Sequence, residues 1–289
     1  MTITPPIRRD LGTMIVYGYP RADLDGELAL ARRIGATCLE ILPDWRSYPD
    51  PADLVARAGD AGLAVRSVHG CWGGQSIRAR QVDLASLDPS SRAESRDDIR
   101  SCLAWASSAG AGFLVVHPGG LSDRADAGRR RDALVASLVD LAVAAGDAGV
   151  MLCVENMPPG VHPGSSMADL AGIVAEVASP MVALALDTGH AAIRRDGPAD
   201  PGLDLAATTR AAGRLLATTH VHDNDGRRDL HWPPGFGVVD WDDWVRHLDA
   251  IDYRGPIVLE CIRHLRSEPG SIDARFLARL RKMTGLDRS

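Results

Sequence analysis

An aspartate and a histidine follow one apolar segment of the chain closely. The run Leu-Ala-Leu that begins at Leu184 ends in Asp187, the chain turns at Gly189, and His190 comes three residues after the carboxylate. A carboxylate oxygen and an imidazole nitrogen that lie close together suit a divalent metal such as Zn²⁺ or Mn²⁺. Asp-Thr-Gly is also a common turn composition, and the aspartate could simply cap a helix. The metal interpretation therefore depends on whether the arrangement recurs elsewhere in the chain.

The arrangement recurs, because most of the predicted strands end in a carboxylate or an imidazole. The residues at these ends are Glu40, His69, His117, Glu155, Asp187, His222 and Glu260. Each one taken singly is explained equally well as a core histidine or a capping acid. Chance placement would scatter such residues among strands, helices and loops, so their shared position predicts that they meet at one place in the fold.

Strands and helices alternate along the whole chain. The predicted strands are Met14–Tyr17, Thr37–Ile41, Val65–His69, Phe113–His117, Met151–Glu155, Val182–Asp187, Thr218–His222 and Ile257–Glu260. The predicted helices are Leu24–Ile34, Pro51–Ala61, Arg92–Ala109, Arg130–Ala148, Met167–Ala178, Asp204–Leu216, Asp240–Leu248 and Ile272–Met283. Strict alternation selects a parallel sheet, and eight strand-helix units select a closed barrel. We therefore expect an α/β fold, a (β/α)8 TIM barrel forming a single domain over residues 1–289, with its active site at the carboxyl ends of the strands.

Composition excludes several other classes of protein. The only lysine, Lys282, lies near the C-terminus, which argues against Schiff-base chemistry, and no G-x-G-x-x-G motif follows the first strand. The five cysteines show no C-x-x-C spacing, so neither a disulfide framework nor a structural zinc site is indicated. A net charge of -6 argues against a nucleic-acid partner. No apolar run is long enough to span a membrane and Met1 to Asp10 lacks a signal-peptide core, so we expect a cytoplasmic protein without a membrane partner.

Four of the strand-end residues offer a complete set of metal ligands. Glu155, Asp187, His222 and Glu260 supply carboxylate oxygens and one imidazole, which suit Mn²⁺, Zn²⁺, Co²⁺, Fe²⁺ or Mg²⁺. His220 lies two residues before His222 and therefore shares its face of the strand. We rank His220 second as the ligand from this strand.

The motifs around these residues resemble those of the xylose isomerase-like superfamily. They are Val-Glu-Asn at Glu155, Asp-Thr-Gly-His at Asp187, His-Val-His-Asp-Asn-Asp-Gly from His220, and Leu-Glu at Glu260. The superfamily contains sugar phosphate isomerases and epimerases as well as endonuclease IV. In its ketose 3-epimerase branch, residues at the four strand ends bind one divalent metal. The resemblance implies that Glu155 and Glu260 are the catalytic acid-base pair and that His190 binds substrate.

Two enzyme classes and one non-enzymatic role remain open from the sequence. The first is a metal-dependent isomerase or epimerase that transfers a proton through an enediolate in a ketose, ketose phosphate, cyclitol or related hydroxy-ketone. The second is a phosphodiesterase like endonuclease IV, which binds three zinc ions and cleaves abasic DNA; its additional ligands have counterparts in His69, His117, Asp229 and His231. The net charge, Glu40 and a short loop between His222 and Asp229 favour the first class. A metal-binding barrel without catalysis, serving as a partner subunit, is the third.

Some residues near the strand ends are candidates for binding a carbohydrate-like substrate. Glu40 ends a predicted strand, and Trp72 follows His69 closely and could stack on a sugar ring. Arg227 and Arg263 could hold hydroxyl or anionic groups, although arginines in such positions usually face solvent. The sequence leaves the identity of the metal, the oligomeric state and the phosphorylation of the substrate open.

Overall fold

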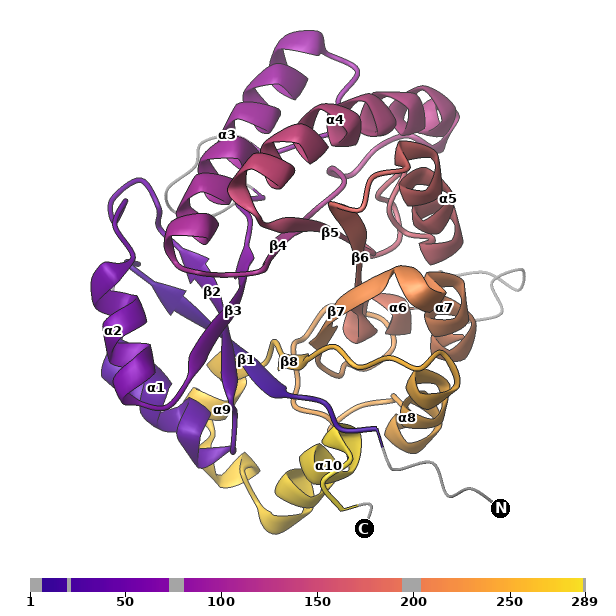
Figure 1. The fold of residues 1–289 in the computed structure, drawn as a ribbon. Coiled ribbons are helices and arrows are strands. Elements are labelled where there is room, and N and C mark those ends of the chain that lie inside the picture. Colours follow the sequence, from indigo (N-terminus) through magenta and orange to yellow (C-terminus); the bar gives the residue numbers. More distant parts are fainter. Residues whose placement is uncertain (1–6, 20–21, 73–80, 194–203, 288–289) are drawn as a thin grey trace, which may run out of the picture.

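The chain folds into a closed barrel of eight parallel strands surrounded by helices (Figure 1). The computed structural model describes residues 7–19, 22–72, 81–193 and 204–287. The strands are β1 (Leu11–Tyr17), β2 (Cys38–Pro43), β3 (Ala64–His69), β4 (Phe113–Val116), β5 (Met151–Glu155), β6 (Val182–Asp187), β7 (Leu216–Val221) and β8 (Ile257–Leu259). They follow one another in sequence order around the barrel, and β1 pairs with β8 to close it. The prediction of a single TIM barrel domain is confirmed.

The helices form the outer ring of the barrel. They are α1 (Leu24–Arg33), α2 (Ala52–Asp60), α3 (Pro89–Ser108), α4 (Ala127–Ala148), α5 (Met167–Val177), α6 (Thr188–Ala192), α7 (Leu205–Ala212), α8 (Trp241–Ala250), α9 (Ile262–Ser267) and α10 (Ala274–Thr284). Short 3₁₀ turns lie at Arg124–Asp126, Gly213–Leu215 and Pro269–Ser271. Among the described residues, no helix is long and apolar enough to cross a membrane.

Alternation along the strands separates the core into two regions. Leu184 and Leu186 of β6 pack in the large cluster between strands and helices, whereas Ala183 and Ala185 belong to a small cluster of residues inside the barrel. Successive side chains of a strand point to opposite faces. Asp187 therefore continues the inward-facing row of β6. The same alternation continues the inward row of β5 from Cys153 to Glu155.

The predicted elements are largely confirmed, with differences at particular ends. Glu40 is the third residue of β2 rather than its last, because Ile41 and Leu42 continue the strand as buried residues. The helix expected to run to Leu216 ends as an α-helix at Ala212, and β7 already begins at Leu216. The short helices α6 and α9 were not predicted. The helix α6 follows β6 directly and carries His190, whereas Glu260 and Cys261 separate β8 from α9.

Candidate metal centre and active site

Ten histidines and carboxylates meet at the carboxyl ends of the strands. They form five overlapping groups, and within each group the potential ligand atoms all lie within 4.8 Å of one another. The groups are His69, His220 and Glu260; His69, His117 and Glu155; Asp187, His190 and His222; His222, Asp229 and His231; and Glu155, Asp187, His220 and Glu260. The structure thus brings together the strand-end residues that the sequence predicted to converge, with Glu40 just below them.

The largest group contains His220 where the sequence favoured His222. Nδ1 of His220 lies 3.2 Å from Oε1 of Glu155 and 3.2 Å from Oε2 of Glu260. In the pairing of β6 with β7, Asp187 stands opposite His220. His222 follows the end of β7, and its Nε2 lies 3.0 Å from Oδ2 of Asp187. The geometry therefore favours His220 over His222 as the partner of both glutamates.

Glu40 lies beneath this group and does not face the opening of the barrel. It is fully buried, and Oε1 lies 2.7 Å from Nε2 of His220. Oε2 accepts a hydrogen bond of 2.6 Å from the hydroxyl of Ser67. Protein groups thus contact both oxygens, and this argues against the predicted role of Glu40 in substrate binding.

A second group shares Glu155 with the first and consists of His69, His117 and Glu155. Oε2 of Glu155 lies 3.3 Å from Nε2 of His117 and 3.7 Å from Nε2 of His69. Nδ1 of His69 is 2.8 Å from the carbonyl oxygen of Gly70, so this contact fixes the ring with Nε2 toward Glu155. The half-buried ring of Trp72 packs edge-on against His69, with centroids 4.9 Å apart, and lies 5.8 Å from His117. Trp72 therefore borders the group of His69, His117 and Glu155.

The third part of the cluster involves the loop after β7. Oδ2 of Asp229 lies 3.4 Å from Nε2 of His190 and 3.2 Å from Nε2 of His231. Backbone carbonyls hold the opposite nitrogens of both rings: Nδ1 of His190 is 2.9 Å from the oxygen of Asn156, and Nδ1 of His231 is 2.9 Å from the oxygen of Glu260. Asp229 and His231 reach the cluster despite the short loop between His222 and Asp229.

Two of the residues that orient this cluster were missed by the sequence analysis. The side chain of Asn156 donates to the carbonyl oxygen of Asp187 and accepts from its N–H, which ties the ends of β5 and β6 together. Asp223 is fully buried and accepts four hydrogen bonds within its loop, from the backbone N–H groups of Asn224, Gly235 and Val239 and from the indole of Trp241. Their only signal in the sequence is that each directly follows a site residue, Glu155 or His222.

Replacing Asp223 by Asn is expected to loosen the loop that carries Asp229 and His231. In asparagine an NH₂ group replaces one of the two carboxylate oxygens, and its N–H groups would face two of the four donors that Asp223 binds. We therefore expect the free energy of unfolding to fall by about 2–4 kcal/mol. Chemical denaturation measures this loss. Asp225→Asn is the control, since Asp225 pairs with the exposed Arg228 at the surface of the same loop. Equal effects of the two changes would contradict the role given to Asp223.

Mutual pairing sets the ionisation of the cluster. Burial acts to lower the pKa of His220, but Glu40, Glu155 and Glu260 raise it well above its ordinary value. Burial acts to raise the pKa of Glu155, but the facing histidines hold it well below its ordinary value. Burial acts to lower the pKa of His231, but Glu260 and Asp229 raise it to about 10. The cluster concentrates negative charge that protons or cations must compensate.

The donor set fits a divalent metal ion. Oε2 of Glu155, Oε2 of Glu260 and Nδ1 of His222 are buried and have no hydrogen-bond partner among the described residues. A buried acceptor without a donor is costly, and coordination of a cation would remove that cost. Carboxylate oxygens mixed with imidazole nitrogens suit Mn²⁺, Zn²⁺, Co²⁺ or Fe²⁺, and the carboxylates also suit Mg²⁺.

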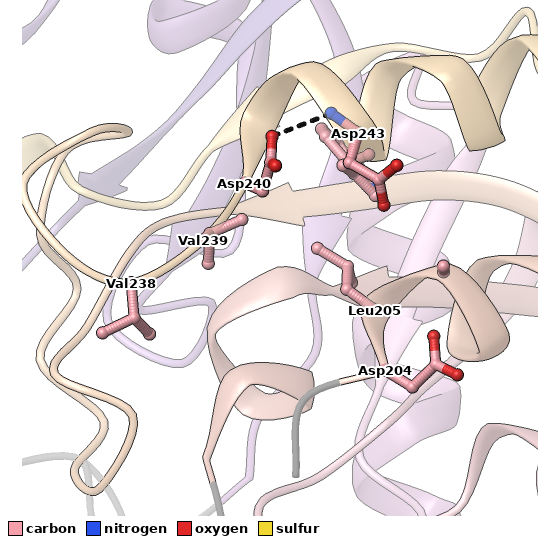
Figure 2. Close-up of a pocket in the computed structure, with 8 residues that line it drawn as sticks. Asp204, Leu205, Val238, Val239, Asp240 and Asp243 are labelled. Atoms are coloured by element: carbon pink, nitrogen blue, oxygen red, sulfur yellow. Dashed lines mark hydrogen bonds between the residues drawn. The ribbon is translucent and has the colours of Figure 1, made fainter. Parts of the chain in front are cut away.

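Two predicted substrate-binding arginines lie outside the cluster. Arg227 and Arg263 are exposed, and neither forms an ion pair with a described residue of the cluster. A separate cavity of about 240 Å³ lies between the beginnings of α7 and α8 (Figure 2). Two of its aspartates cap those helices: Asp204 accepts from the N–H of Ala207, and Asp240 accepts from the N–H of Asp243. The third, Asp243, pairs with Arg246, so each aspartate of this cavity has a structural partner.

A closed barrel of parallel strands with histidines and carboxylates gathered at the strand ends defines a TIM barrel with a candidate metal centre. Residues 28–280 match the family model described as xylose isomerase-like TIM barrel, and the chain belongs to that family.

Proteins similar to this chain in sequence or in fold carry names of two enzyme classes. The chain is 35% identical over 305 residues, 93% of this chain and 96% of the relative, to a protein of Solibacter usitatus named probable endonuclease 4. Among solved structures, 3-keto-D-glucoside 4-epimerase from E. coli matches with a TM-score of 0.73 at 19% identity, covering 95% of this chain and 100% of that one. D-psicose 3-epimerase from Clostridium cellulolyticum matches with a TM-score of 0.72 at 19% identity, covering 96% and 98%. The similarity to the two epimerases is one of fold.

Proposed function

We propose that this protein is a divalent-metal-dependent isomerase or epimerase of a ketose, ketose phosphate, cyclitol or related hydroxy-ketone. The observation that carries the proposal is the meeting of Glu155 and Glu260 at one imidazole. They come from β5 and from the residue after β8, and each has an oxygen 3.2 Å from Nδ1 of His220. Two carboxylates at one centre are what a proton removal and a proton return require. The epimerases of similar fold support the same class.

Each residue of the centre has a task in this reaction. One glutamate accepts the proton from the carbon beside the carbonyl, and the other donates a proton to complete the isomerisation or epimerisation. Asp187 and His220 complete the set that would hold the metal with both glutamates. A bound divalent metal supplies electrostatic stabilisation of the negative charge that develops on the substrate oxygens. Trp72 offers a ring face beside the two histidines for stacking on the substrate.

Isotope exchange tests this proposal directly. Protein loaded with Mn²⁺ is incubated in D₂O with a panel of ketoses, ketose phosphates and inososes, and the products are read by NMR and mass spectrometry. We expect deuterium to enter at the carbon beside the carbonyl of at least one member. A complete lack of exchange across the panel, from protein with measured metal content, would count against the proposal.

The convergence of the cluster favours a second candidate, a phosphodiesterase like endonuclease IV. Shared residues link the four-residue group to further groups, as a centre for several metals needs; these contain His69, His117, His190, His222, Asp229 and His231. The sequence analysis counted Glu40 in favour of the isomerase, but Glu40 is fully buried, so its charge does not face a DNA backbone. The relative named probable endonuclease 4 supports the same alternative. A centre holding several metals could polarise a phosphate and activate a hydroxide.

Metal content and strand cleavage separate the two candidates. Elemental analysis of the purified chain is expected to give one tightly bound metal per chain for the isomerase and three for the phosphodiesterase. A duplex with one abasic site, assayed beside an intact duplex of the same sequence, should stay uncut if the protein is an isomerase. Three metals together with nicking of the abasic duplex alone would replace the first proposal by the second. Bound metal without either activity would indicate a non-catalytic barrel.

A further inference from the structure

We propose that Glu40 is a positioning residue, which sets the nitrogen that His220 presents to Glu155 and Glu260. The inference rests on the metal-binding part of the proposed function and gives Glu40 a task that does not require contact with substrate. The distance of 2.7 Å between Nε2 of His220 and Oε1 of Glu40 is typical of a charge-assisted hydrogen bond. Nε2 donates this bond, so Nδ1 is left to face the two glutamates.

The backbone places Glu40 at the required depth in the barrel. The pairing of β2 with β3 shifts between Leu39 and Glu40, so that Glu40 stands opposite Ser67 and Arg66 is skipped. Irregularities of this kind re-aim side chains near active sites. Here the shift puts the hydroxyl of Ser67 2.6 Å from Oε2 of Glu40. Ser67 thereby holds one oxygen of the carboxylate, and the other oxygen accepts a hydrogen bond from His220.

The orientation of His220 depends on a negative charge at this position. Each ring nitrogen of His220 faces a carboxylate, Glu40 on one side and Glu155 with Glu260 on the other. A buried carboxylate that lost its donor would be strongly disfavoured, so Glu40 keeps the proton of His220 on Nε2. Partners that hold the far nitrogen of a ligating histidine fix its tautomer and its ring orientation. Glu40 has the position and the chemistry of such a partner.

The test compares metal binding in Glu40→Gln, Glu40→Leu and the parent protein. We expect the affinity for Co²⁺, measured by competition with a chelating dye, to fall about 10- to 100-fold in Glu40→Gln. Glutamine keeps an acceptor for Nε2 but removes the charge. Glu40→Leu removes both and should bind Co²⁺ more weakly still, with an altered visible spectrum of the bound ion. If the leucine variant fails to fold, the glutamine variant alone decides the question.

Glu27→Gln is the matched control. Glu27 is also a buried carboxylate, but it lies on α1, accepts from the N–H of Val16 and pairs with Arg266. We expect its loss to change thermal stability without changing Co²⁺ affinity. The inference would be overturned if Glu40→Gln kept the parental Co²⁺ affinity and spectrum and lost only as much stability as Glu27→Gln. Glu40 would then have a structural role alone.

The outcome is independent of whether the proposed reaction occurs. Weakened Co²⁺ binding in the Glu40 variants supports the inference even if no substrate in the panel exchanges deuterium, a result that counts only against the isomerase. A parent chain that binds no Co²⁺ at all overturns both the inference and the metal dependence of the proposed function.

Discussion

Replacement of Glu155 by glutamine should reduce isotope exchange by about 10²- to 10⁴-fold, the range over which a positioned acid or base contributes to a rate. An amide cannot accept the proton from carbon. Glu155 is also the residue shared by the four-residue group and the group of His69 and His117. The same substitution should therefore lower the metal content of the purified protein, which elemental analysis measures alongside the exchange rate.

Glu176→Gln provides the isosteric control for this substitution. Glu176 lies on α5 and pairs with Arg131 of α4 in the outer ring of helices. Exchange and metal content should both stay at the parental level. If Glu155→Gln exchanged deuterium at the parental rate, Glu155 would not be an acid or base of the reaction. The isomerase proposal, which depends on the pair of glutamates, would then be contradicted.

Gly189→Ala is expected to destabilise the protein by about 3 kcal/mol, at the upper end of the usual cost of overpacking. A Cβ atom at Gly189 would lie 1.8 Å from Cε1 of His222, closer than any real contact. His222 is fully buried, and its ring stacks on that of His231 with centroids 4.1 Å apart. The ring would have to leave both this stack and its contact of 3.0 Å with Asp187.

Gly172→Ala provides a control for which we expect the opposite change in stability. Gly172 lies within α5, is exposed, and has no atom within 4 Å of a built Cβ. Alanine there should stabilise the protein by about 0.5–1 kcal/mol, because glycine loses more backbone freedom on folding. Thermal and chemical denaturation of both variants measure the two values. A Gly189→Ala protein as stable as its parent would show that the site repacks freely around His222.

The distribution of residue types along the chain was sufficient to predict the architecture. Apolar segments that alternate with helical ones require a parallel sheet, and eight of them close a barrel. The same reasoning placed Glu155 and Asp187 at strand ends, where the structure has them. It also led to the convergence of acids and imidazoles, because the carboxyl ends of all parallel strands open on one rim.

Depth and register inside the barrel could not be predicted. A period of two residues allows either His220, in β7, or His222, just after its end, to join Glu155 and Glu260. The choice follows from the pairing of Asp187 with His220, which includes a register shift between β6 and β7. Glu40 was placed at a strand end by the sequence, but the length of β2 puts it lower, under His220.

The sequence by itself determined the barrel, the rim and the kinds of ligand gathered there, because periodicity and residue type act locally along the chain. Only the tertiary structure decided which histidine meets the glutamates, and that Asn156 and Asp223 orient their neighbours. These outcomes depend on hydrogen bonds between segments far apart in the chain and on shifts of a single residue between strands. Such shifts leave the local pattern of the sequence unchanged, yet they reverse which side chains meet.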